Sequence, residues 1–141
     1  MVFRSARPFH PERLWNFLNR DFPQNVIRTK GLFWLAAMPG HALSFSQAGG
    51  SLRIENAGVW WAMMTHEERL MYPDYAQNRK EIESRWDHEF GDRLNELVII
   101  AQDLDEKTMQ ENMQACLLSP QELKDYKNKV YFENPFDAVL S

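Results

Sequence analysis

Residues 42–55 have the sequence ALSFSQAGGSLRIE, in which apolar and polar side chains alternate on both sides of a Gly-Gly pair. Leu43 and Phe45 fall on one side of an extended chain and the neighbouring serines on the other, because successive side chains of a strand point to opposite faces. The Gly49-Gly50 pair is typical of a tight hairpin turn. This stretch predicts two antiparallel strands with one buried face and one face in water.

The segments around this hairpin extend it into a sheet. Residues 26–37 are rich in β-forming side chains and end near a Pro39-Gly40 turn, which predicts a third strand of the same meander. Val2–Ala6 predicts a short strand. Glu96–Gln102 is apolar at most positions, which predicts a central strand that is covered or closely flanked on both faces.

Four helices are predicted from apolar spacing and from capping residues. Pro11–Asp21 has one apolar face at helical spacing, and residues 75–85 predict a second helix with Asp74 as its cap. Asp105 is placed to cap a third helix, whose apolar stripe includes the single cysteine. The run Ser119–Glu122 is a complete capping box with proline at the first helical position, which predicts the start of the fourth.

The predicted order of elements is β-α-β-β-β-α-β-α with one further helix at the end. An α+β two-layer sandwich satisfies this order, with a largely antiparallel sheet of four or five strands and helices on one face. Such a sandwich is a variant of the ferredoxin-like arrangement. Residues 1–127 are expected to form this domain and residues 128–141 an irregular C-terminal tail; 141 residues are enough for one core.

Composition and charge exclude several classes of protein. The chain has 16 Lys and Arg against 20 Asp and Glu, a net charge of −4, and the two signs are interleaved, which does not favour nucleic-acid binding. No apolar run approaches the roughly 20 residues of a membrane span, and the N-terminus lacks the apolar core of a signal peptide. Cys116 is the single cysteine, so no internal disulfide is expected. We expect a cytoplasmic protein with neither nucleic-acid nor membrane partners.

The motifs that carry catalysis or metal binding are weak in this sequence. It contains neither a phosphate-binding glycine-rich loop nor a nucleophile elbow, so no catalytic residue is predicted. The densest groups of potential metal ligands are His66-Glu67-Glu68 and Asp87-His88-Glu89, of which Asp87, His88 and Glu89 are the weak metal candidates. Adjacent residues rarely face one metal ion together, so a solvated loop is the favoured interpretation of both groups.

The pair Trp60-Trp61 is a candidate interaction site. Both indoles cannot point inward from an extended strand, because successive side chains alternate between its faces. One of them is therefore expected either to pack under the following segment or to lie in an exposed patch that suits a protein partner. The sequence leaves these two alternatives open.

Residues 86–100, WDHEFGDRLNELVII, resemble the W-D-x-x-F-G-D-R-x-x-E-L-V-F-I signature of the CobW C-terminal domain. Residues 7–14, RPFHPERL, and residues 30–36, KGLFWLA, are similar to two further motifs of that domain in the expected order. The resemblance covers roughly residues 3–125. The signature residues that match are Trp86, Asp87, Phe90, Gly91, Asp92, Arg93 and Glu96.

This resemblance implies a role in GTP-dependent metal delivery, either cobalt insertion for cobalamin synthesis or zinc homeostasis. In the family, GTP, Mg and the transported Zn or Co are bound by a GTPase half through a phosphate loop and a C-x-C-C motif, neither of which this sequence contains. The resemblance therefore implies that this chain is a non-catalytic, cofactor-free accessory domain. Such a domain docks on a CobW-type GTPase domain, on a metalloprotein client, or on both. The alternative is a small stand-alone metal- or ligand-binding protein that uses residues 87–89.

Overall fold

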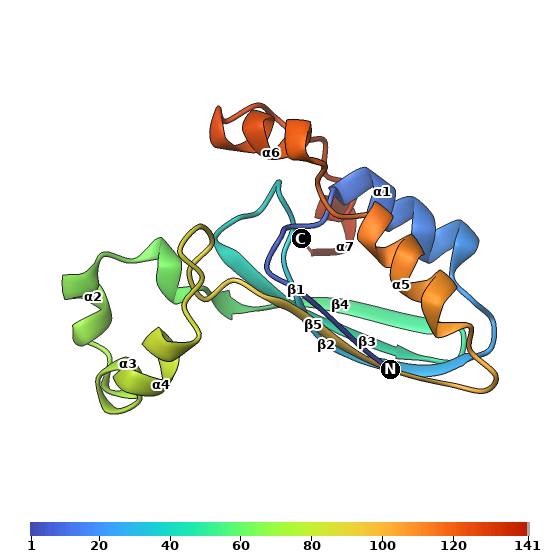
Figure 1. Ribbon diagram of the computed structural model, residues 1–141, viewed down its shortest axis with the longest axis horizontal. Helices are drawn as coiled ribbons and strands as arrows, with labels where there is room; N and C mark the ends of the chain where they lie inside the picture. Colours follow the sequence, from blue (N-terminus) through green and yellow to red (C-terminus); the bar gives the residue numbers. More distant parts are fainter. Residues whose placement is uncertain (141) are drawn as a thin grey trace.

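A five-stranded antiparallel sheet forms one layer of the computed structural model, which describes residues 1–140 (Figure 1). Its strand order is β1-β5-β2-β3-β4, and each neighbouring pair runs antiparallel. The strands are β1 (Val2–Ser5), β2 (Val26–Phe33), β3 (His41–Ala48), β4 (Ser51–Val59) and β5 (Asn95–Ala101). The predicted meander is therefore confirmed as β2, β3 and β4.

Helices form the second layer and an insertion. In Figure 1, α1 and α5 lie over one face of the sheet, while α2, α3 and α4, which join β4 to β5, form a separate lobe beyond the end of the strands. This arrangement confirms the predicted α+β two-layer sandwich. The helical elements are α1 (Pro11–Asn16), the π-helical turn η1 (Phe17–Asp21), the 3-10 turn η2 (Trp61–Met63), α2 (His66–Leu70), α3 (Pro73–Gln77), α4 (Arg79–Ser84), α5 (Glu106–Ala115), α6 (Pro120–Lys127) and α7 (Asp137–Leu140).

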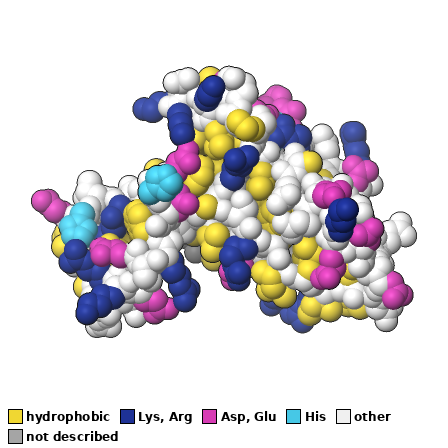
Figure 2. Space-filling model, in the orientation of Figure 1, with side chains coloured by type: hydrophobic (Ala, Val, Ile, Leu, Met, Phe, Trp, Pro, Cys, Tyr) yellow, Lys and Arg dark blue, Asp and Glu magenta, His cyan; other side chains and the backbone are white. Residues whose placement is uncertain are grey.

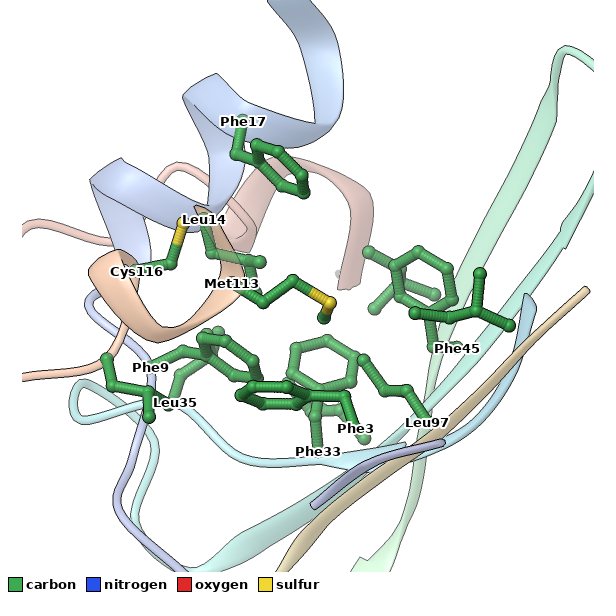
Figure 3. Packing of buried hydrophobic residues seen from close by; sticks show 14 of the residues in the cluster. Phe3, Phe9, Leu14, Phe17, Phe33, Leu35, Phe45, Leu97, Met113 and Cys116 are labelled. Atoms are coloured by element: carbon green, nitrogen blue, oxygen red, sulfur yellow. The ribbon is translucent and has the colours of Figure 1, made fainter. Parts of the chain in front are cut away.

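The main hydrophobic core lies between the sheet and the helices above it (Figure 3). Phe33 of β2 is at its centre, with its ring 6.2 Å from the ring of Phe9 and 6.0 Å from that of Phe45. Cys116 is buried in this core, and burial raises the pKa of its thiol to about 11. The thiol is therefore protonated at neutral pH and packs as a small apolar group, as its place on the helix stripe predicts.

No helix within residues 1–140 lies over the opposite face of the sheet (Figure 1). Strand β5 is an interior strand, as predicted, and Leu97 and Ile99 are buried on its helix side. Val98 and Ile100 on its other side are 46% and 53% exposed. The expectation that both faces of this strand are covered is therefore wrong, because the helical insertion lies beyond the end of the sheet instead of beneath it.

The predicted helix over residues 75–85 is divided into α3 and α4. The N-cap of α3 is Tyr72 and Pro73 takes the first helical position, so the expected Asp74 cap is wrong and Asp74 lies in the first turn. Proline suits this first position because its missing N–H would have no partner in the helix. The Asn78 side-chain amide donates to the Asp74 carbonyl oxygen at 2.8 Å and ends α3. Residues 79–84 then form α4.

Both predicted N-caps downstream of β5 are confirmed. The Asp105 carboxylate accepts the backbone N–H of Thr108 at the start of α5, and Ser119 and Glu122 form the reciprocal capping box of α6. The C-terminal tail is less irregular than expected, because it contains α7 and because the Phe136 side chain is fully buried in the main core.

We predict that Ile99→Ala destabilises the fold by about 2–5 kcal/mol, because it removes a fully buried side chain and leaves a cavity. The matched control is Ile100→Ala, one residue further along the same strand and half exposed, for which less than about 1 kcal/mol is expected. Urea unfolding of the two variants measures both effects. Equal costs would show that the two faces of β5 do not differ in burial.

Candidate functional site: the signature loop and the adjoining groove

The signature residues form a tight loop between α4 and β5. The backbone N–H of Asp87 donates to the Gly91 carbonyl oxygen, and the N–H of Gly91 donates back to Asp87, each at 2.8 Å. The Asp87 carboxylate also accepts the backbone N–H groups of Glu89 and Phe90 at 2.8 and 2.9 Å. The loop therefore uses Asp87 to hold its own shape.

Gly91 lets this loop pass between two other parts of the chain. Its φ is +70°, in the left-handed region that residues with a Cβ rarely adopt. A Cβ at this position would lie 2.6 Å from the Cβ of Ala62 and 3.0 Å from the Trp86 ring. Only glycine fits both the backbone conformation and the space.

Asp92 connects the loop to the start of the helical insertion. Its carboxylate oxygens accept the backbone N–H of Trp61 at 2.9 Å and that of Ala62 at 2.8 Å. These two N–H groups belong to the first turn of η2, where no earlier helical carbonyl is available to them. Hydrogen bonds to a charged group contribute about 1.5–3 kcal/mol each, so this carboxylate fixes where the chain turns after β4.

Arg93 connects the same loop to the β2–β3 turn. Its Nε donates to the Pro39 carbonyl oxygen at 2.7 Å, and one terminal nitrogen donates to the Phe90 carbonyl oxygen at 3.2 Å. The guanidinium lies 5.2 Å from the centre of the Trp34 ring, within range of a cation–π interaction. Arg93 is thus occupied by internal contacts.

The three sequence motifs meet at Trp34. Its ring packs edge-on against Phe90 at 5.6 Å, its Nε1 donates to the Ala6 carbonyl oxygen, and its backbone N–H donates to Asn95 at 2.8 Å. The buried Asn95 amide donates in turn to the Arg7 carbonyl oxygen at 2.6 Å. Sequence reasoning did not select Asn95, although a polar residue at the start of an apolar strand was the available indication.

The glycine of the second motif allows two strands to approach each other. A Cβ on Gly31 of β2 would lie 1.9 Å from the carbonyl oxygen of Glu96 in β5. Glycine inside a strand commonly marks such a close backbone approach. Glu96 itself is partly exposed, and its side chain pairs with Arg4 of β1 at 2.7 Å.

The tryptophan pair lies just after β4 and not within a strand. Trp60 is only 8% exposed and packs with Trp34 and Phe90, so it offers little surface to a partner. Trp61 is partly exposed, and its ring lies 5.3 Å from that of Tyr75 in α3. An interaction role therefore remains a prediction for Trp61, whereas the burial of Trp60 removes it from the accessible surface.

Arg69 of α2 holds the insertion together. Its Nε donates to the Trp61 carbonyl oxygen at 2.8 Å, and its guanidinium lies 4.5 Å from the centre of the Trp86 ring. The buried Tyr75 adds a bond from its hydroxyl to the Glu83 carboxylate at 2.9 Å. The Arg69 guanidinium also lies 6.0 Å from the centre of the Tyr75 ring, so side chains link the three short helices of the insertion to one another.

The weak metal candidates do not form a donor set. Asp87 is committed to the loop backbone, the Glu89 carboxylate pairs with the Lys127 ammonium, and His88 is exposed. Among residues 1–140, no three His, Cys, Asp or Glu side chains are grouped closely enough to hold a metal ion. Residues 87–89 therefore do not fit the three or four converging ligands of a zinc site.

A groove of about 680 Å³ lies between the signature loop, the insertion and the uncovered face of the sheet. Leu32, Glu96 and Val98 from the sheet line it on one side. The insertion and the loop supply the other side with mainly apolar and aromatic side chains and one cation: Trp61, Ile82, Arg85 and Trp86. Figure 2 shows a hollow between the lobe of the insertion and the sheet half of the molecule.

A second polar cluster joins α1 to α6. The Arg13 guanidinium donates two bonds to the Glu122 carboxylate, at 2.8 and 2.6 Å, and the Ser119 N–H donates a third at 2.8 Å. The bond from Arg13 is the main reason that the pKa of Glu122 falls to about 2. Burial lowers the pKa of His10, whose Nε2 is 3.5 Å from the same carboxylate. This cluster anchors α6 to α1, which gives His10 and Arg13 of the motif at residues 7–14 a structural role.

The sequence match identifies the family of this domain. Residues 1–117 match the family model described as the cobalamin synthesis protein cobW C-terminal domain, and the chain belongs to this family. No helix within residues 1–140 is long and apolar enough to cross a membrane.

Relatives with longer chains carry the same domain. The zinc chaperone Rv0106 of Mycobacterium tuberculosis is 32% identical over 134 residues, which cover 95% of this chain and 33% of that protein. The zinc-regulated GTPase metalloprotein activator 1 of Dictyostelium discoideum is 33% identical over 125 residues, covering 86% and 26%. The chain thus spans between about a quarter and a third of the length of these relatives.

A solved structure supports the fold. The Zn(II)-bound YjiA GTPase from E. coli superposes with a TM-score of 0.54 at 14% identity, over 84% of this chain and 29% of that one. This likeness concerns the fold of the domain.

We predict that the Arg13–Glu122 cluster makes the free energy of unfolding fall as the pH is lowered below about 4.5. The folded-state pKa of Glu122 is about 2 against an ordinary value of 4.5, so its contribution is complete above about pH 4.5 and is lost as the pH falls toward 2. Glu122→Gln should cost about 1.5–3 kcal/mol at pH 7, and the cost should shrink between pH 4.5 and pH 2. Urea unfolding across this range measures it.

The control for this prediction is Glu133→Gln, which removes an exposed carboxylate. It should leave the pH dependence of unfolding as in the wild type. A cost of Glu122→Gln that stays constant from pH 7 to pH 2 would mean that the carboxylate does not stabilise the fold through its charge.

Proposed function

We propose that this chain is a non-catalytic accessory domain of a CobW-type GTP-dependent metal chaperone, and that the metal is zinc. The observation that carries the proposal is the match of residues 1–117 to the family domain, together with relatives named as a zinc chaperone and a zinc-regulated GTPase metalloprotein activator. These names favour zinc homeostasis over cobalt insertion for cobalamin synthesis.

A non-catalytic role is supported by how the polar signature residues are used. Asp92 and Arg93 have the chemistry of catalytic groups, yet both are committed to backbone partners inside the domain. Asp87 is committed in the same way to its own loop. The signature therefore stabilises a joint between the sheet and the insertion, and the nucleotide chemistry of the relatives is assigned to the part of their chains outside this domain.

The partners that follow are a CobW-type GTPase domain, a metalloprotein client, or both. GTP, Mg and the zinc cargo are assigned to the GTPase half. The accessory domain contributes a shaped surface beside that half, which suits a chain whose uncovered sheet face and groove expose apolar side chains.

We predict that the chain alone neither binds nor hydrolyses GTP, because it lacks the glycine-rich loop with Lys and Ser or Thr that holds phosphates and Mg²⁺. Isothermal titration with GTP and a phosphate-release assay measure this. Heat-sensitive phosphate release above a protein-free control would contradict it.

The same titration with zinc and cobalt separates the accessory domain from a stand-alone metal-binding protein. The accessory role predicts no binding at micromolar concentration by the isolated chain. Micromolar zinc binding that is lost in His88→Ala would instead support a metal site at residues 87–89.

A further inference from the structure

The uncovered face of the sheet has an apolar stripe along two of its strands. Val2 of β1 is opposite Val98 of β5, and Ile100 follows on the same face two residues along. Their side chains are 48%, 46% and 53% exposed, and Leu32 of β2 on the same face is 40% exposed. A contiguous apolar stripe on a sheet is a feature of surfaces that are covered by a partner.

One lysine and one arginine side chain border this stripe. The register places Lys30 opposite Val98 and Arg28 opposite Ile100, so both project from the uncovered face. The other charges of this face form pairs, Arg4 with Glu96 and Arg53 with Glu55. Within residues 1–140, neither Lys30 nor Arg28 has a carboxylate within ion-pair distance.

The stripe continues into the groove beside the insertion. Leu32 and Val98 belong to both, and the groove adds Ile82 and Trp86 as apolar groups and Arg85, which pairs with Glu81 at 3.4 Å. In Figure 2 hydrophobic and basic side chains lie together along the lower margin of the sheet half. We call this continuous surface, made of the stripe, its two flanking cations and the groove, the open-face surface. Its stripe carries two cations, Lys30 and Arg28, that have no carboxylate partner among residues 1–140.

The place where a longer relative leads into this domain indicates what covers the open-face surface. In the family this domain is C-terminal, so the preceding segment of a longer relative enters at β1. Strand β1 is an edge strand, and the nitrogen of Met1 donates to the Ile99 carbonyl oxygen at 2.7 Å, which holds the entering chain beside β5. The larger part of such a relative is thereby connected next to Val2, at the border of the open-face surface.

We propose that the open-face surface is the docking surface for the GTPase half, an inference that rests on the proposed function. The contacting segment of that half presents apolar side chains that cover Val98 and Leu32. Carboxylates flank these side chains and pair with Lys30 and Arg28. Such a surface combines an apolar centre that gives affinity with a charged border that selects the partner.

The test uses the part of the M. tuberculosis zinc chaperone that lies outside the matched third as a probe, titrated calorimetrically into the full chain. Lys30→Glu reverses one exposed cation and Val98→Glu places a charge in the apolar stripe; each should weaken binding by about tenfold or more. Lys107→Glu is the matched control, because Lys107 is an exposed cation on α5 in the other layer. It should change affinity by less than about twofold.

The outcomes separate the two proposals. Absence of binding by the wild-type chain contradicts docking on a GTPase domain, which is the part of the proposed function that this inference requires, and the inference fails with it. Wild-type binding that both Lys30→Glu and Val98→Glu retain contradicts this inference alone. Because Lys30 is exposed, its variant tests the surface even if Val98→Glu fails to fold, which circular dichroism reports. Self-association of the chain through the same residues, with no binding to the probe, would also overturn the inference.

Discussion

The carboxylate of Asp92 accepts the backbone N–H groups of Trp61 and Ala62, and these two bonds fix where the chain turns from β4 into the helical insertion. The insertion leaves the sheet after β4 and returns into β5, so its two ends must be held close together. Gly91 makes this possible, because any larger residue would collide with Ala62 and the Trp86 ring. The partly buried carboxylate of Asp92 accepts hydrogen bonds from these two backbone N–H groups, and hydrogen bonds to a carboxylate are stronger than those between neutral groups.

The location of the uncovered surfaces follows from this joint. Because the insertion is held beyond the end of the strands, it neither covers the second face of the sheet nor packs on the helical layer (Figure 1). The apolar residues of β5 on that face remain exposed, and the side of α4 becomes one wall of the groove. The signature residues thus shape a surface through contacts inside the domain, which is compatible with the accessory role proposed above.

The sequence predicted most of the sheet and the helix caps, because these depend on local patterns. Alternation in residues 42–55, the Ser119–Glu122 box and the Asp105 cap each act over a few neighbouring residues. Two expectations were not met: that both faces of β5 are covered, and that residues 75–85 form one continuous helix. The sequence of β5 is apolar at the same positions whether its second face is covered by a helix or left open. In residues 75–85 the apolar spacing is that of one helix, but the Asn78 side chain ends α3 within it. The convergence of Asn95, Trp34 and Arg7 depends on contacts between distant segments, which no local pattern contains.

Native-state hydrogen exchange of the Trp61 and Ala62 amides tests the account most directly. If the Asp92 carboxylate holds the insertion to the signature loop, both amides should open with the same high free energy as the amides of β5, near that of global unfolding. Exchange of Trp61 and Ala62 as fast as that of the exposed amides of α2 would contradict the account, because the insertion would then separate from the sheet while the rest of the fold stays intact.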